Sequence, residues 1–321
     1  MPELTPATGV KLRQILDDTF PIWNDGLQFD RYVQFWDAQL RTAWGATHLD
    51  RVALVDGDDV ITSAKRYDLS ARVDGRIRRV LGIGAVFTTP ARRGQGWGQR
   101  LLETILETAE AEGYEYAMLF SEIGREYYER LDFVPVPLVE SQLEVSRKGG
   151  APAMLVRAGD DRDIPAIADM SARRVEGARF ALDRSDDWIR YGIAKRRLLA
   201  GLGPPDVRQV EFLVAEEGHQ AVAYVVSMIH EGRWFIEDAG DRDPAGARLG
   251  AMLQTMLART PHVASPIIRA WLPHGFVPPQ VERVYTQPIG EVLMIRPLED
   301  RTLPLPPLDA AQVAFCRLDY F

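Results

Sequence analysis

One stretch indicates the architecture of this chain: Leu81-Gly-Ile-Gly-Ala-Val-Phe-Thr-Thr-Pro-Ala-Arg-Arg-Gly-Gln-Gly-Trp-Gly-Gln-Arg-Leu-Leu102. Its first residues are typical of a buried strand, and the apolar spacing after Pro90 predicts a helix from about Gly94 to Ala111. A strand that enters a helix through a glycine-rich turn leaves backbone N–H groups free at the helix start, where the dipole favours an anion. The turn carries three glycines and two arginines, which are Gly94, Gly96, Gly98, Arg92 and Arg93. Glycine lets a pyrophosphate approach the backbone and arginine adds charge, so the segment predicts a phosphate cradle.

Two common nucleotide-binding patterns are absent from this cradle. A dinucleotide fingerprint needs G-x-G-x-x-G/A, whereas Gly94-Gln-Gly96-Trp-Gly98-Gln99 places the third glycine one residue early. No G-x-x-x-x-G-K-S/T run occurs, so a Walker A loop is excluded. Hydride transfer and nucleotide hydrolysis therefore lose support. By itself, the glycine-rich turn fits an unliganded helix start equally well.

The segments around the cradle predict a mixed, mostly antiparallel sheet flanked by helices. Helices are expected at Gly9–Phe20, Phe29–Trp44 and about Arg125–Leu131, and strands at Arg51–Val55, Asp59–Val73, Arg76–Phe87 and Tyr116–Ser121, with two more near Val134 and Leu143. Asp74-Gly75 between two β-rich runs is a strong hairpin signal. This order belongs to the α/β (α+β) class. Aromatic side chains crowd the first two helices, where they either form core or line a pocket.

The second half of the chain repeats this order of elements. Strands are expected at Met154–Ala158, Phe212–Ala215, Ala221–Met228, Trp234–Ile236, Ile267–Trp271, Arg283–Thr286 and Glu291–Ile295, and helices at Asp161–Val175, Trp188–Leu199 and Gly246–Leu257. The polar run at residues 148–152 suits a linker. We therefore expect two tandem domains, at residues 1–147 and 153–299, and a tail at 300–321 that is extended and then docked.

Composition excludes several classes of protein. The chain has 321 residues, 46% of them apolar, and no run approaches the roughly 18 apolar residues of a spanning helix. The N-terminus lacks a signal-peptide pattern and Cys316 is the only cysteine, which together favour a cytoplasmic protein. With the five histidines scattered, we expect no metal site.

The charge pattern narrows the choice of partners. A net charge of −8 argues against bulk nucleic-acid binding, which needs many lysine and arginine contacts to phosphates. One basic segment runs from Lys65 to Arg100. Three interpretations of this segment stay open: a solvated hairpin face, a site for a phosphorylated ligand and a local nucleic-acid surface. We expect a small-molecule partner, with neither nucleic acid nor membrane, and the acidic surface favours a cationic molecule.

In this context the cradle resembles the signature of the GNAT acyltransferase superfamily, a strand followed by R-x-x-G-x-G/A at a helix start. The matching residues are Arg93-Gly-Gln-Gly96-Trp-Gly98, preceded by Val86–Pro90. The second half also begins like a GNAT domain, with Leu155–Ala158 and Asp163–Asp169. Its equivalent turn, Asp241-Arg-Asp-Pro-Ala-Gly-Ala-Arg-Leu-Gly250, lacks the signature. We therefore expect a degenerate second copy that binds no cofactor.

The resemblance implies that acetyl-coenzyme A is the donor. It further implies an N-acetyltransferase that acts on a primary amine of a small, cationic acceptor by direct attack. The cofactor contacts implied on the strand and the turn are Val86, Phe87, Thr88, Arg93, Gly94, Gln95, Gly96, Trp97 and Gly98, with Ser121 on the next strand. Backbone N–H groups of the strand that carries Val86, Phe87 and Thr88 would then polarise the thioester carbonyl.

Three residues are candidates for proton transfer. In many GNAT enzymes a tyrosine four residues before a Gly-aromatic pair lies beside the coenzyme sulfur, and Tyr128 has that spacing before Asp132-Phe133, with aspartate in place of glycine. The run Ser121-Glu122 followed by Tyr128 is also similar to the enhanced-intracellular-survival (Eis) group of GNAT proteins. That similarity implies Tyr128 as the general acid and the terminal carboxylate of Phe321 as the base. Glu122 is the alternative base.

Two other functions stay open. A non-catalytic acyl-coenzyme A-binding module would keep the cradle and lose the transfer step, because a fold does not fix a function. A thiol-conjugate synthase of the tandem-GNAT kind would differ from an Eis-type enzyme only in its acceptor.

Overall fold

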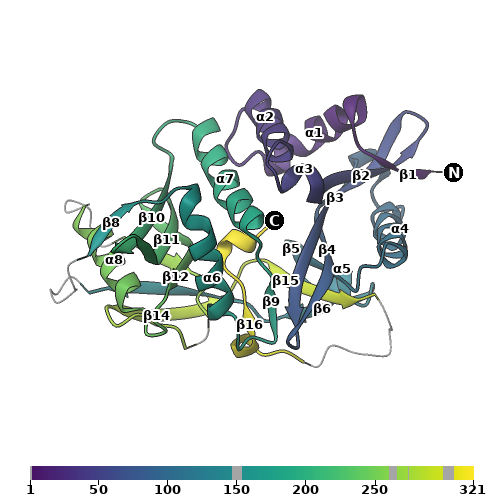
Figure 1. Cartoon of the computed structure of the whole chain (residues 1–321). Coiled ribbons are helices and arrows are strands. Elements are labelled where there is room, and N and C mark those ends of the chain that lie inside the picture. The colour runs from purple at the N-terminus through teal and green to yellow at the C-terminus, as the bar shows by residue number, and fades with distance from the viewer. Residues whose placement is uncertain (1, 147–153, 260–265, 274, 299–306) are drawn as a thin grey trace.

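The computed structural model of the chain describes residues 2–146, 154–259, 266–273, 275–298 and 307–321. Two mixed sheets stand side by side, and helices cover them (Figure 1). The expected α/β (α+β) class and the two similar halves are confirmed. The predicted linker at 148–152 lies outside the described residues.

The first sheet holds the cradle. Its strands are β1 (Glu3–Pro6), β2 (Leu49–Asp56), β3 (Asp59–Val73), β4 (Arg76–Thr88), β5 (Tyr116–Ser121), β6 (Val134–Val136), β9 (Phe180–Leu182), β15 (Val292–Pro297) and β16 (Val313–Ala314). The main order is β1-β2-β3-β4-β5-β15-β6, and β9 joins beside β3. β4 and β5 are parallel because a helix connects them, whereas most neighbours are antiparallel.

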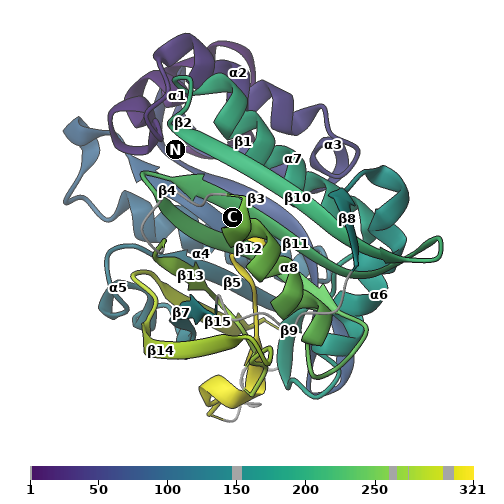
Figure 2. The same ribbon diagram turned by 90° about the vertical axis from the view of Figure 1, so that its left-hand side faces the viewer.

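The second sheet has the order β14-β7-β13-β12-β11-β10-β8. Its strands are β7 (Val139–Val145), β8 (Leu155–Ala158), β10 (Arg208–Glu217), β11 (Gln220–His230), β12 (Arg233–Asp241), β13 (Ile268–Ala270) and β14 (Val281–Pro288). The long strands β10, β11 and β12 form an antiparallel ladder, and Figure 2 views it with α8 beside it. Only β12 and β13 are parallel among the described pairs of this sheet.

The helices cover the sheets and join the two halves. They are α1 (Gly9–Trp23), α2 (Phe29–Leu40), α3 (Gly45–His48), α4 (Trp97–Ala111), α5 (Glu126–Glu129), α6 (Ile164–Arg174), α7 (Asp186–Leu202) and α8 (Ala247–Ala258). α4 buries Leu101, Leu102 and Ile105 against the first sheet, as its apolar spacing predicts. α7 belongs to the second half and packs against α2 of the first, so the halves share a core.

The two sheets exchange strands, which amends the expected division of the chain. β7 lies before residue 147 yet pairs with β13 and β14 in the second sheet. β15 lies within 153–299 yet pairs with β5 and β6 in the first sheet. Strand sequences alone do not specify which sheet a strand enters, because both sheets offer an apolar face and an edge. The boundaries 1–147 and 153–299 therefore do not separate the sheets.

Local chemistry explains where elements begin and end. The Asp74-Gly75 hairpin turn has φ values of 47° and 80°, as a tight turn between β3 and β4 requires. The helix expected over Phe29–Trp44 ends at Leu40, because the Thr42 hydroxyl donates to the Gln39 carbonyl and accepts from the Gly45 N–H. The strands β1, β9 and β16 were not predicted, since each has four residues or fewer.

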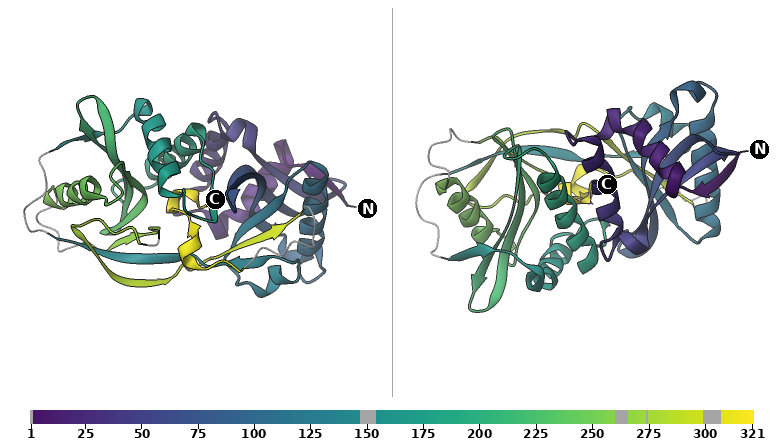
Figure 3. Two further views of the ribbon diagram at one scale, coloured as in Figure 1. Left: turned by 60° about the horizontal axis from the view of Figure 1, so that its bottom comes forward. Right: turned by 90° about the horizontal axis from the view of Figure 1, so that it is seen from above.

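The end of the tail, from residue 307, is docked between the halves, and the part expected to be extended, up to residue 306, lies outside the described residues. In both views of Figure 3 the C-terminus lies between the two sheets. The Asp319 carboxylate is fully buried and accepts hydrogen bonds from Arg184, from the Trp188 indole at 3.2 Å and from the Cys316 N–H at 3.0 Å. Arg184 also pairs with buried Asp238 at 3.1 Å. This cluster anchors the chain next to its last two residues, Tyr320 and Phe321, which are half-buried.

Candidate active site

The first sheet splays open at the end of β4. Pairing between β4 and β5 covers only Val80–Ile83 on β4, so Val86–Thr88 has no strand partner on that side in the described chain. A bulge opposite Ala64 accompanies the splay, and Ala85 adopts a φ of 47°. The predicted cofactor strand thus presents backbone N–H and C=O groups to an open gap rather than to a neighbouring strand.

The glycine-rich turn leaves the start of α4 uncapped. Gly94 and Gly96 have φ values of 72° and 81°, a region that favours glycine, and Gly96 is the N-cap of α4 without any side-chain cap. A Cβ on either glycine would meet open space, so the approach to these N–H groups is clear. Gly98 is tighter, because a Cβ there would lie 3.0 Å from the Tyr127 hydroxyl oxygen.

The side chains of the turn are arranged around this open helix start. The Arg93 Nε donates to the Thr88 carbonyl at 3.1 Å, which ties the turn to the end of β4. The Trp97 indole donates to the Gln95 side chain at 3.2 Å. In the described chain Arg92, Arg93 and Arg100 have no ion-pair partner, whereas Arg66, Arg78 and Arg79 of the basic segment are paired with acidic residues. Three unpaired arginines of the segment thus lie at the cradle, whereas Lys65, Arg72 and Arg76, which also form no ion pair among the described residues, lie elsewhere on β3 and β4.

A cavity of about 500 Å³ adjoins the splayed strand. It is lined from α1, α2, β3, β4, β5, α7 and the C-terminal tail, and it brings together four of the predicted site residues: Val86, Glu122, Tyr128 and Phe321. Aromatic residues of the first two helices that line it are Trp23, Tyr32, Phe35 and Trp36. The aromatic crowding in the sequence therefore serves both the core and the pocket.

Tyr128 has the surroundings of a tyrosine that stays protonated. Its side chain is 7% exposed, and its ring packs edge-on to Tyr127 and Phe133 at centroid distances of 5.0 and 6.1 Å. Burial, with smaller contributions from Tyr127 and Glu122, raises the pKa of Tyr128 to about 12. Asp132 adopts the left-handed conformation, with a φ of 60°, that the glycine of the motif would supply.

Phe321 and Glu122 both line the cavity, one from the C-terminal tail and the other from the end of β5. The Phe321 ring packs on Tyr67 and Phe120, and a Cβ on Gly84 would lie 3.7 Å from a terminal oxygen of Phe321. The terminal carboxylate thus lies against β4 at the bulge. Glu122 accepts from the Trp23 indole at 3.3 Å and from the Tyr320 hydroxyl at 3.4 Å, on an exposed part of the cavity wall.

Two further predicted cofactor contacts, Ser121 and Phe87, interact with other residues of the chain. The Ser121 side chain is buried and donates to the Gly124 carbonyl, so its hydroxyl is already engaged. The Phe87 ring lies 6.3 Å from the Trp23 ring and 5.5 Å from the Arg93 guanidinium. Its backbone carbonyl accepts from the Thr62 hydroxyl at 2.8 Å.

Sequence reasoning did not assign Arg51, Lys65 and Lys195 to the site, although all three line the cavity. Lys65 was identified only as the start of the basic segment, and Arg51 is marked only by the apolar run Val52–Val55 that follows it. Burial, then Arg196, lowers the pKa of Lys195 to about 7, while its ammonium donates to the Tyr320 carbonyl at 3.3 Å. At neutral pH Lys195 is thus partly an uncharged amine, which makes it a further candidate base.

In the second half, a side-chain carboxylate occupies the turn that corresponds to the cradle. The Asp241 carboxylate accepts from the backbone N–H groups of Arg248 and Leu249 at 2.9 Å and of Asp243 at 2.9 Å. It therefore uses the N–H groups that a phosphate would need at the start of α8. A Cβ on Gly250 would collide with the Gln280 side chain, so the approach is also narrow. These contacts give a physical reason for expecting no cofactor in the second half.

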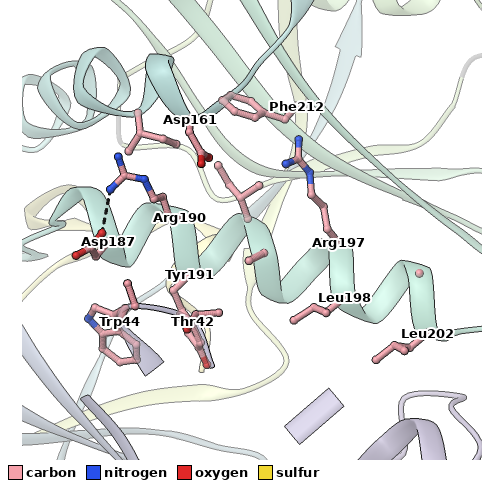
Figure 4. A pocket seen from close by; sticks show the side chains of 15 residues that line it. Thr42, Trp44, Asp161, Asp187, Arg190, Tyr191, Arg197, Leu198, Leu202 and Phe212 are labelled. Carbon is pink, nitrogen blue, oxygen red and sulfur yellow. Dashed lines mark hydrogen bonds and ion pairs between the residues drawn. The ribbon is translucent and has the colours of Figure 1, made fainter. Parts of the chain in front are cut away.

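A second cavity, of about 510 Å³, lies on another face of α7. Figure 4 shows its wall along the helix, with Asp187, Arg190 and Arg197 projecting from α7 and Thr42 and Trp44 opposite. Arg190 is paired with Asp187 at 2.9 Å, and none of the predicted site residues lines this cavity. The cavity beside β4 is therefore the candidate active site. In the described residues no cluster of three histidine, cysteine or acidic side chains is placed to hold a metal.

Comparison with known proteins places the cradle in a family. A sequence profile of the GNAT acetyltransferase domain matches residues 13–136, which contain β4, the glycine-rich turn and Tyr128. These residues form a GNAT acetyltransferase domain. The protein is thus an acyltransferase, and acyl-coenzyme A is the donor class that GNAT domains bind. No curated protein matches the sequence, and none of the helices in the described ranges is long and apolar enough to cross a membrane.

Solved structures share the two-sheet architecture of this chain. A GCN5-related N-acetyltransferase from Kribbella flavida superposes with a TM-score of 0.70 at 18% identity, over 92% of this chain and 71% of that one. Eis1 from Mycobacterium abscessus gives 0.59 at 11% identity, over 92% and 74%. A tandem GNAT protein from the clavulanic acid biosynthesis pathway gives 0.52 at 14% identity, over 94% and 99%. The expected tandem-GNAT fold is confirmed.

Proposed function

We propose that the protein transfers an acetyl group from acetyl-coenzyme A to a primary amine of a small molecule. The observation that carries this proposal is the meeting of Val86, Tyr128 and Phe321 in one cavity at the splayed end of β4. Backbone groups for the donor, a protonated tyrosine and a carboxylate are the parts that direct acyl transfer to an amine needs. The cavity is large enough for a small acceptor, and both aromatic and charged side chains line it.

Acetyl-coenzyme A, when bound, supplies the thioester whose C–S bond breaks as the new C–N bond to the amine forms. The N–H groups at the start of α4, with Arg92 and Arg93, are proposed to hold the pyrophosphate. The open backbone of Val86–Thr88 is proposed to hold the pantetheine arm and to stabilise the developing oxyanion. The remaining cofactor contacts, Gly94–Gly98 and Ser121, stay predictions.

Three proton transfers accompany this reaction, because the acceptor nitrogen enters as an ammonium and leaves as an amide. The ammonium loses its first proton before attack, and we propose the Phe321 carboxylate as the base that takes it, with Glu122 as the alternative. The departing thiolate gains a proton, and we propose that Tyr128 donates it, since burial keeps that hydroxyl protonated at neutral pH. The nitrogen loses its second proton as the amide forms, and this proton restores the Tyr128 phenol, while the Phe321 carboxyl releases its proton to solvent.

The proposal is tested by two readouts on one preparation. Thermal unfolding with and without acetyl-coenzyme A reports donor binding, because a ligand that binds only the folded state raises the melting temperature. Thiol release with a panel of small amines reports transfer. A melting shift together with amine-dependent thiol release supports the proposal. A shift without release for any amine would instead favour a non-catalytic acyl-coenzyme A-binding module, and release only with thiols or their conjugates would favour the synthase alternative.

A further inference from the structure

Two cations stand next to each other on the floor of the acceptor cavity. Arg51 on β2 and Lys65 on β3 are direct cross-strand partners in the antiparallel ladder, so their side chains share one face of the sheet. The Arg51 guanidinium lies 5.4 Å and the Lys65 ammonium 5.0 Å from the centre of the Trp36 ring. Both side chains line the cavity.

Neither cation has a partner of opposite charge. Within the described residues Arg51 forms no ion pair, and none of its three guanidinium nitrogens makes a hydrogen bond of good geometry, although the residue is only 3% exposed. Its polar neighbours are the phenols of Tyr32 and Tyr67, which are uncharged. Lys65 forms no ion pair in that part of the chain either. The neighbouring Tyr67 hydroxyl is buried and also lacks a partner. Unpaired buried charges are costly, and side by side these two cations also repel each other.

The acidic groups of the cavity are engaged elsewhere or stand apart. Glu237 pairs with Arg196 at 2.6 Å, and Glu122 accepts from Trp23 and Tyr320. Asp25 and Glu291 also line the cavity, and neither forms an ion pair with Arg51 or Lys65. The Phe321 carboxylate lies one ladder step away, against Gly84, which pairs with Lys65, and it too forms no ion pair with them. Among the described residues, therefore, neither cation is paired with a carboxylate of the cavity.

We propose that Arg51 and Lys65 bind an anionic oxygen group, carboxylate or phosphate, of the acyl acceptor. This inference rests on the proposed function and specifies its substrate class: a compact amine that carries its own negative group, as an amino acid or an amine phosphate does. The planar guanidinium of Arg51 offers two parallel N–H donors to such a group. The overall charge of −8 predicts a cationic acceptor, whereas the cavity floor favours a zwitterionic one.

The position of the pair fits a short acceptor. Lys65 is the ladder partner of Gly84, which is two residues from Val86 on the proposed cofactor strand. Adjacent cross-strand side chains lie about 5 Å apart. An anion on Arg51 and Lys65 therefore places an attached amine within a few bond lengths of the splayed strand and of the Phe321 carboxylate. Long polyamines would leave this anion site empty.

The test compares matched acceptors and matched variants. Phenylalanine is compared with phenethylamine, and phosphoethanolamine with ethanolamine, so that each pair differs in the anionic group. Arg51→Met and Lys65→Met keep the packing on Trp36 but remove the charge, and Arg76→Met removes an exposed arginine at the hairpin tip as a control. Acceptor binding is measured by calorimetry in the presence of coenzyme A, and the KM by thiol release.

We expect the member of at least one pair that carries the anionic group to bind at least tenfold more tightly than the member that lacks it. Arg51→Met and Lys65→Met should each remove that preference, whereas Arg76→Met should keep it. Preference within the first pair identifies a carboxylate and within the second a phosphate. Equal binding within both pairs, or a preference that survives in Arg51→Met and Lys65→Met, would overturn the proposal. A melting shift with acetyl-coenzyme A that equals the wild-type shift shows that a variant is folded. Calorimetry measures acceptor binding even if no amine is acetylated. Failure of the proposed acetyl transfer can therefore be distinguished from failure of the anion site.

Discussion

Single residues in this protein illustrate how burial sets protonation in the cavity. Tyr128 and Lys195 line the same space, yet burial raises the pKa of the phenol and lowers that of the ammonium, because it disfavours the charged form of each. At neutral pH the cavity thus contains a protonated phenol and a partly deprotonated amine. Both are states that assist proton transfer between an amine and a thiolate.

Lys195 makes stability depend on pH. Its pKa is about 7 in the folded chain and about 10.4 in an unfolded one, so between these values the unfolded state holds more protons and stability rises with pH. Lys195→Met should therefore raise the melting temperature at pH 7, and this gain should disappear near pH 10.5. Thermal unfolding across this range checks the prediction, with Lys11→Met on α1 as control. A gain independent of pH would show that packing, not charge burial, is responsible.

At the scale of elements, the cradle was predictable from sequence because its chemistry is local. The strand, the turn glycines and the apolar face of α4 all lie within residues 81–102 and the helix that follows. Glycine at a positive φ and an uncapped helix start are features that adjacent residues determine. The floor of the acceptor cavity was not predictable in this way, since Arg51 and Lys65 become partners only through strand register.

The cradle predicts a specific loss on charge reversal. Arg93→Glu puts a carboxylate beside the proposed pyrophosphate site and removes a donor, and a hydrogen bond to a charged group is worth about 1.5–3 kcal/mol. Because about 1.4 kcal/mol corresponds to a tenfold change in a binding constant, we expect the affinity for acetyl-coenzyme A to fall at least about tenfold. Calorimetric titration measures the effect. Arg76→Glu is the matched control, because it makes the same change on the exposed hairpin, and equal affinities in both variants would place the cofactor elsewhere.

For the whole molecule, the exchange of β7 and β15 and the docked tail make the halves interdependent. Their destinations depend on contacts between residues more than one hundred positions apart, such as Met294 with Leu119. Sequence patterns predicted both strands but not the sheet that each one joins, because periodicity reports burial and not partners. The tail then completes the cavity from the far end of the chain, since Tyr320 and Phe321 line the same space as Tyr128.

The tail clamp should be essential to this arrangement. Asp319→Ala leaves the Arg184 guanidinium without one of its two buried carboxylates, a change that typically costs about 3–5 kcal/mol. We expect a lower melting temperature and lower transfer activity, because the Phe321 carboxylate is released from β4. Asp17→Ala removes the exposed partner of Arg13 on α1 and serves as the control. A stable, fully active Asp319→Ala variant would show that the tail does not need this clamp.

The most direct test of the account is the turnover number of Tyr128→Phe, measured as coenzyme A thiol release with a productive amine. The substitution keeps the ring between Tyr127 and Phe133 and removes only the proton donor. We predict a fall of about 10²-fold or more with nearly unchanged affinity for acetyl-coenzyme A. Tyr114→Phe, which removes a buried hydroxyl outside the cavity, should keep full activity. An unchanged turnover number in Tyr128→Phe would contradict the assignment of Tyr128 as the general acid.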